Sequence, residues 1–152
     1  MLQNLFRRPT HFDDAAKSKF AANIAEMLEL QKCLAGVVSI EDEQGYPKRK
    51  ALGYVYGYID AALRVRGHDM ADMSIGVPIT FQVIRELWPD HVNKYMDFLA
   101  KNITGDPLMM IGVTHGGQQY LDYSKPGATG APMGLARFMI EGDTPLRGPD
   151  AR

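Results

Sequence analysis

The sequence predicts an all-α fold, a compact bundle of five main helices plus a short C-terminal helix, with little or no strand. Three observations support this prediction. Apolar residues recur three and four positions apart along most of the chain. Prolines and glycines stand where helices are expected to begin and end. Two of the expected helices each carry glycines four residues apart, Gly53 with Gly57 and Gly112 with Gly116.

The paired glycines predict where two helices meet. Glycine inside a helix costs roughly 0.5–1 kcal/mol relative to alanine, so four such positions suggest a common reason. Residues four apart share one helix face, and a pair of glycines therefore opens a shallow notch. We expect the helices around 50–66 and 107–124 to cross closely at these four glycines, which would admit another backbone or a ligand.

The first half of the chain contains the first two helices. The first is expected over about 11–35, where Thr10 and Asp13 have the spacing of a capping box and Gly36 is a natural stop. The second is expected over 47–66, ending before Gly67. Leu52, Tyr56, Ile59 and Leu63 form one apolar stripe along it.

A loop of about ten residues is expected over 68–77, followed by a third helix that begins near Pro78 and ends before Pro89. Asp90 is then expected to cap a fourth helix, and Asp106 with the proline after it to start a fifth. A sixth, short helix is expected over 132–140. Because the connections are short, most successive helices should pack roughly antiparallel.

A chain of 152 residues is most consistent with one domain. We expect a flexible N-terminal arm over 1–9, a single helical domain over 10–140, and a disordered C-terminal tail over 141–152. The net charge of -1 disfavours a general role in binding nucleic acid or an anionic membrane. The single cysteine, Cys33, permits no intrachain disulfide, and no signal peptide or membrane span is recognisable, so a cytoplasmic location is expected.

No catalytic constellation is recognisable in the sequence. The four histidines form no pair or cluster with the spacing of metal ligands, and phosphate-binding and nucleophile motifs are missing. His68, Asp69 and Asp72 could hold an ion in a loop, although an ordinary polar loop is the simpler interpretation. We therefore predict no catalytic residues, no metal and no cofactor.

One group of residues could still line a ligand pocket. His115 lies between Gly112 and Gly116, where a histidine could reach a bound ligand or act as a general base, or could be satisfied at a helix contact. Asp60 would need a partner if buried, and Arg64 follows one turn later. The candidate ligand-binding residues between the two glycine-bearing helices are Tyr54, Tyr58, Asp60, His115 and Gln119.

The segment Gly53–Leu63, GYVYGYIDAAL, resembles the Gly-Tyr-rich helix of small helical immunity proteins. The resemblance covers about eleven residues of 152. Proteins of that class are typically exported and disulfide-bonded, whereas this chain has one cysteine and no recognisable signal. We assign no family on this basis.

The favoured function is a non-enzymatic protein-interaction protein that binds another protein or itself as a homodimer. The near-neutral charge and the nine methionines are consistent with an adaptable apolar surface, and Met70 with Met73 or Met109 with Met110 could line a groove. The alternative is a small-molecule-binding protein or enzyme with a pocket between the helices around 50–66 and 107–124.

Overall fold

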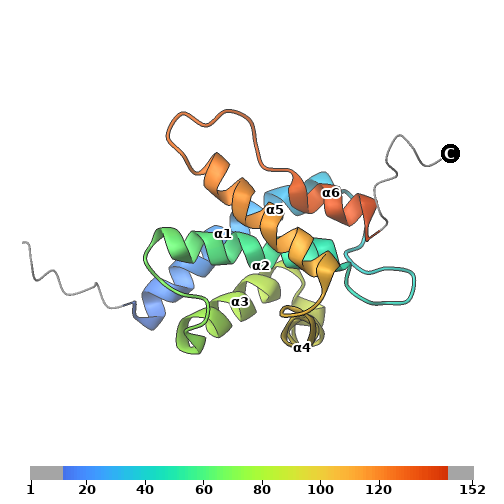
Figure 1. Cartoon of the computed structure of the whole chain (residues 1–152), viewed down its shortest axis with the longest axis horizontal. Helices are drawn as coiled ribbons and strands as arrows, with labels where there is room; N and C mark the ends of the chain where they lie inside the picture. The colour runs from blue at the N-terminus through green and yellow to red at the C-terminus, as the bar shows by residue number, and fades with distance from the viewer. Residues whose placement is uncertain (1–11, 144–152) are drawn as a thin grey trace, which may run out of the picture.

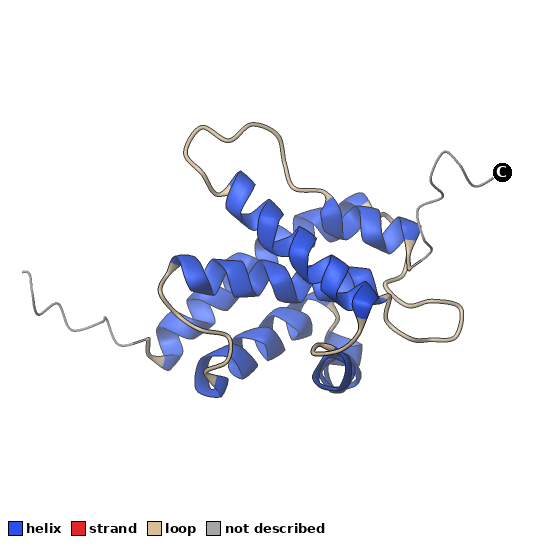
Figure 2. Cartoon of the chain, in the orientation of Figure 1, coloured by secondary structure: helices blue, strands red, loops and turns tan. Residues whose placement is uncertain are grey.

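The computed structural model describes residues 12–143, and within them it contains six α-helices and one 3-10 helix (Figure 1; Figure 2). The helices are α1 (Asp14–Leu34), α2 (Arg49–Val65), α3 (Met73–Leu87), η1 (Pro89–His91), α4 (Val92–Asn102), α5 (Pro107–Tyr123) and α6 (Gly134–Glu141). The β-pairing in this part of the chain is an isolated bridge between Glu41 and Pro47. The predicted all-α class, with a short C-terminal helix, is confirmed.

α2 is the central helix of the fold. It packs against α5, α6 and α3, and its side chains are buried on almost every side. Asp60 and Arg64 mark its one polar side, and the wide apolar surface of the remainder suits the interior of the protein. Its fully buried apolar residues are Ala51, Leu52, Tyr54, Val55, Tyr58, Ile59, Ala62 and Leu63.

The backbones of α2 and α5 touch at the four paired glycines. An ideal Cβ on any of them would lie 2.0–2.2 Å from a carbonyl oxygen of the other helix, far inside van der Waals contact. Each helix therefore fits its carbonyl groups into the notch of the other. The glycine-to-carbonyl pairs are Gly53 with Met109, Gly57 with Val113, Gly112 with Lys50, and Gly116 with Tyr54.

These contacts also give the direction of the two helices. Residue numbers rise together, from Gly53 beside Met109 to Gly57 beside Val113, so α2 and α5 run parallel. α2–α5 and α1–α3 are the two most extensive helix interfaces, and neither joins successive helices. The expectation of roughly antiparallel packing concerns successive helices, so these two interfaces do not contradict it.

α1 and α3 form a second parallel pair. The Lys17 ammonium donates to the carbonyl of Ser74 near the start of both helices, and the Lys32 ammonium donates to the carbonyl of Leu87 near their ends. Figure 1 shows α1 and α3 running together, opposite in direction to α2 and α5. The bundle thus consists of two parallel pairs that oppose each other.

α3 begins five residues before the position expected from Pro78. The Asp72 carboxylate accepts from the Ser74 backbone N–H at 3.0 Å and caps the helix at Met73. Pro78 consequently lies inside the helix and cannot donate to the carbonyl of Ser74. The Lys17 ammonium supplies that missing donor at 3.0 Å, which explains how the helix tolerates an internal proline.

Two other helix starts differ from expectation. α1 begins at Asp14, because the Asp13 carboxylate accepts from the Ala16 backbone N–H at 2.7 Å and is itself the cap. Asp90 does not cap α4, since it lies within η1 and α4 starts after His91. α5 begins at Pro107, after the expected Asp106 cap.

The N-terminus of α2 is capped from a distant part of the chain. Lys48 provides no side-chain cap, and the Asp143 carboxylate instead accepts from the backbone N–H groups of Arg49 and Lys50, each at 3.0 Å. Residues 141–143, expected in the tail, thus belong to the folded domain. The expected arm over 1–9 and the remaining tail over 144–152 lie outside the described residues.

Replacing Gly116 with alanine should lower the free energy of unfolding by about 1–3 kcal/mol or more, because the new methyl group meets a backbone carbonyl that cannot rotate away. Gly117 is the matched control: a Cβ there would lie 3.5 Å from the nearest atom, the carbonyl oxygen of Gly57. Gly117→Ala should be neutral or stabilising by up to about 1 kcal/mol through helix propensity. Urea unfolding measures both variants, and equal effects would contradict the close crossing.

Asp143→Ala should lower the free energy of unfolding by about 0.5–2 kcal/mol, the usual cost of losing a helix cap. Glu43→Ala is the control, since it removes the same charge from an exposed residue without a hydrogen bond or ion pair to the described chain. Thermal unfolding followed by circular dichroism compares the two. A loss no greater for Asp143→Ala than for Glu43→Ala would argue against the distant cap.

Candidate functional site

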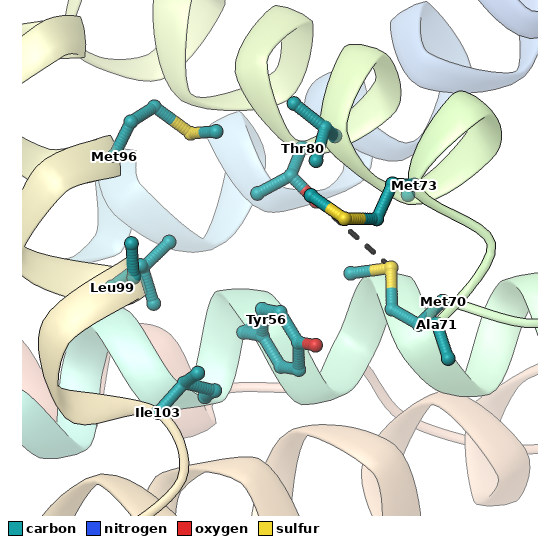
Figure 3. Close-up of a pocket in the computed structure, with 11 residues that line it drawn as sticks. Tyr56, Met70, Ala71, Met73, Thr80, Met96, Leu99 and Ile103 are labelled. Atoms are coloured by element: carbon teal, nitrogen blue, oxygen red, sulfur yellow. Dashed lines mark hydrogen bonds between the residues drawn. The ribbon is translucent and has the colours of Figure 1, made fainter.

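The candidate site is an apolar groove of about 250 Å³ (Figure 3). α3 forms one wall and α4 the other, Tyr56 of α2 lies between them, and the loop over 66–72 closes one end. We call it the methionine groove, after three of the residues that line it. The full lining consists of Tyr56, Met70, Ala71, Met73, Gly76, Val77, Thr80, Met96, Leu99, Ala100 and Ile103.

The groove is open to solvent along α3. Met73 is 72% exposed and Val77 45% exposed, although both are large apolar residues on a helix that is otherwise well packed. Met70 and Met96 face the same space from the loop and from α4 (Figure 3). Methionine side chains are unbranched and polarizable, so a surface of this kind adapts to apolar groups of different shape.

Gly76 places the loop against α3. An ideal Cβ on Gly76 would lie 2.3 Å from the carbonyl oxygen of Met70, so only glycine lets this backbone approach so closely. The Thr80 hydroxyl adds a weak hydrogen bond to the Met70 sulfur at 4.0 Å. Met70 is thereby held at the closed end of the groove.

Tyr56 places a phenol inside the otherwise mainly apolar groove. The Tyr56 hydroxyl points into the space between the walls (Figure 3) and makes no hydrogen bond with another described residue. Burial raises the pKa of Tyr56, and the nearby charge of Asp60 raises it further. The hydroxyl is therefore neutral at physiological pH and free to donate to a bound group.

The loop side of the groove is acidic. Asp69 and Asp72 are exposed there, and neither forms an ion pair within 4.0 Å among the described residues. Hydrogen bonds from the Ser74 hydroxyl and backbone N–H lower the pKa of Asp72, which keeps this carboxylate charged. We call Asp69 and Asp72 the acidic rim.

Other carboxylates near the groove are neutralised by neighbouring cations. Asp60 pairs with Arg64 at 3.1 Å, and Asp97 on α4 pairs with Lys101 at 2.8 Å. Cations lie near the acidic rim as well, since the charge of Lys17 contributes to the lowered pKa of Asp72 and the charge of Asp69 contributes to the raised pKa of Arg64.

A second depression continues from the groove toward α5. It encloses about 310 Å³ and shares Tyr56, Met70 and Ile103 with the groove. Its far side is formed by Met110 and Val113 of α5. The apolar surface thus extends from α3 across α2 to the glycine-bearing helix pair.

The structure does not gather the five predicted ligand-binding residues into one pocket. The hydroxyl of Tyr54 donates to the side-chain oxygen of Gln119 at 2.6 Å, and that oxygen also accepts from the backbone N–H of Gly134. These two residues tie α2 and α5 to α6. The hydroxyl of Tyr58 donates to the sulfur of Met27 on α1 at 3.7 Å.

Asp60 and His115 lie on opposite flanks of the α2–α5 pair. Asp60 lies beside Val113 and Gly117, and His115 stands edge-on to Phe138 of α6 with ring centroids 5.3 Å apart. His115 is two residues from both Val113 and Gly117 in the sequence. It therefore projects from α5 about 200° around the helix axis from them, on the side away from Asp60. The predicted convergence of Asp60 and His115 is therefore wrong.

The most polar cluster among the described residues has a structural role. The carboxylate of Glu41 accepts from the Tyr95 hydroxyl at 2.8 Å and from the Lys94 ammonium at 3.1 Å. Burial opposes ionisation of Glu41, but these two hydrogen bonds outweigh it and lower its pKa. A carboxylate held in this way fastens the loop before α2 to α4 and is poorly suited to take a proton.

No group of three or more histidine, cysteine or acidic residues within 12–143 is arranged to hold a metal ion. None of the described helices combines the length and apolar character required to cross a bilayer. Comparison of the chain with protein-family models, with curated proteins and with solved structures found no match.

Buried tyrosines make stability sensitive to alkali. Burial raises the pKa of Tyr58 to about 12 and also raises that of Tyr54 and Tyr95. Because an unfolded tyrosine ionises near pH 10, this stabilisation is fully present below about pH 10 and is lost as the pH rises toward about 12. Urea unfolding across this range should show the decline, and Tyr58→Phe should make it shallower. Native tyrosinate absorbance that titrates entirely near pH 10 would contradict the assignment.

Proposed function

We propose that this chain is a non-enzymatic protein-interaction protein whose methionine groove receives apolar side chains of a partner protein. The observation that carries the proposal is the groove itself, an open apolar surface with Met73 and Val77 exposed at its edge. Contiguous exposed apolar surface on a folded domain is characteristic of protein contacts.

The size of the groove favours side chains over a whole ligand. Its volume of about 250 Å³ lies below the range of about 300–1,000 Å³ that is usual for small-molecule sites. Two helices that flank an apolar channel match the mode in which an amphipathic helix of a partner inserts its apolar face. Methionines on both walls would allow the groove to adjust to that face.

A small-molecule function is the second candidate, and the depression between α2 and α5 favours it. That depression adds about 310 Å³ beside the groove, and Asp60 with Arg64 supplies polar groups at its edge. A ligand that filled both spaces would contact the Tyr56 hydroxyl and the guanidinium of Arg64.

Self-association is a form of the first proposal, in which a second copy of this chain supplies the apolar side chains that enter the methionine groove.

Site-specific photocrosslinking tests the proposal. p-Benzoylphenylalanine placed at Met73 in cells should give a covalent product with another protein chain, because this side chain lies on the groove. The matched control places the same residue at Tyr46, which is aromatic and 56% exposed but lies on the loop before α2. Mass spectrometry of the product distinguishes a different protein from a second copy.

Val77→Glu, combined with p-benzoylphenylalanine at position 73, should abolish the product because it introduces a charge into the apolar wall of the groove. The new carboxylate stays in contact with solvent, since Val77 is partly exposed. Equal products at positions 73 and 46, or no product at 73, would overturn the proposal. A native mass above the chain mass by a few hundred daltons, together with no product at 73, would favour the small-molecule candidate.

A further inference from the structure

α1 carries an apolar stripe on its solvent side. Met27, Leu30 and Leu34 lie on one face of the helix, and Val37 follows in the turn after it. These large apolar side chains are 38%, 67%, 56% and 104% exposed, in that order. We call these four residues the α1 stripe.

The stripe lies on the side of α1 that neither α3 nor α6 occupies. The Lys32 ammonium binds a backbone carbonyl of α3 at 2.6 Å, and the side-chain oxygen of Gln31 accepts from a backbone N–H of α6 at 3.1 Å. Successive helical residues turn by about 100°, so Leu34 and Leu30 project about 60° and about 100° beyond Gln31, away from Lys32. The stripe thus faces away from α3, which forms a wall of the methionine groove.

The spacing of the stripe is that of a seam between helices. Its residues follow one another by three, four and three positions, the alternation by which one helix packs along another. Two antiparallel copies reach a register in which Leu30 faces Leu34 and Met27 faces Val37, so every residue of the stripe meets an apolar residue of the other copy. The antiparallel orientation also brings helix ends of opposite partial charge together.

Charge does not oppose this register. Lys32 lies level with the two-fold axis but is turned toward α3 by its hydrogen bond. Glu26 is exposed at the edge of the stripe, and it lies opposite the segment that follows the helix in the other copy rather than opposite the other Glu26. The side chains nearest the axis are Leu30, Leu34 and the thiol of Cys33, so no like charges meet there.

We infer that the partner of this face is a second copy of the chain, whose own α1 stripe pairs with the first in antiparallel orientation across a two-fold axis. A two-fold interface uses the same patch on both copies, so the four exposed side chains are buried twice. The inference goes beyond the proposed function and does not depend on it, because the methionine groove stays open in such a dimer.

Sedimentation of the full chain over a range of concentrations tests the inference. The wild-type protein should dimerise, and Leu30→Glu should raise the dissociation constant of the dimer at least about tenfold, because a carboxylate in the seam loses its water. Circular dichroism verifies that the variant is folded. The matched control is Val65→Glu, which adds the same charge at an apolar residue that is 60% exposed outside the stripe and should leave the dissociation constant unchanged. A monomeric wild-type protein, or equal effects of the two variants, would overturn the inference.

A charge pair tests the antiparallel register. Leu30→Glu and Leu34→Lys should each be monomeric alone. Their equimolar mixture should dimerise, since residue 30 of one copy faces residue 34 of the other and the two new charges then attract. A mixture that stays as monomeric as its components would overturn the pairing we infer.

Cys33 provides an independent readout, because it is the single cysteine of the chain and is exposed. The register brings the two Cys33 side chains to the axis, so a short bis-maleimide should join two wild-type copies covalently. The yield should fall in Leu30→Glu. A protein that sediments as a dimer without forming this product would use a different interface and would overturn the inference.

Met73→Glu separates the stripe from the methionine groove as the place of self-association. Loss of the dimer in Met73→Glu but not in Leu30→Glu would place the second copy in the groove and overturn the inference. Conversely, photocrosslinking of a different protein at position 73 should persist in the Leu30→Glu background. A stable wild-type dimer through the stripe without any product at position 73 would overturn the proposed function and leave this inference standing.

Discussion

The backbone contact between α2 and α5 is the constraint on which the rest of this structure depends. Four glycines bring carbonyl groups of each helix into the other's notch, and this is possible only while the helices run parallel at one register. Parallel helices place their positive N-termini side by side. The carboxylates of Asp106 and Asp143 lie at those ends, and Asp106 also binds the guanidinium of Arg49 at 2.8 Å. These carboxylates thus offset the repulsion between the two positive helix N-termini.

The same contact determines which side of α2 stays open. Because α5 covers one side of α2 without intervening side chains, α2 becomes a buried core helix with Tyr56 directed toward α3 and α4. α6 closes the other flank through Gln119, which accepts from both Tyr54 and Gly134. The methionine groove is the open side of α2, and a change that separated α2 from α5 would alter its floor.

Local signals in the sequence predicted the helices and the partners of their glycines, because caps and notches depend on residues close together in the chain. Three features depend on residues far apart and were not predictable in this way. α3, which Asp72 caps at Met73, tolerates Pro78 in its interior because Lys17 replaces the donor that Pro78 lacks. α2 is capped by Asp143. His115 and Asp60 lie on opposite flanks of the α2–α5 pair because the register of the glycine contact places Asp60 beside Val113 and Gly117, about 200° around α5 from His115. The methionine groove was visible only as the spacing of Met70 and Met73.

The cap on α2 bears on how the protein is made. Asp143 is synthesised 94 residues after Arg49, so residues 49–65 leave the ribosome before α5 and Asp143 are available to cover and cap them. A helix of this length is marginal in water without tertiary packing. The final structure of α2 should therefore form late, when the last described residues have emerged.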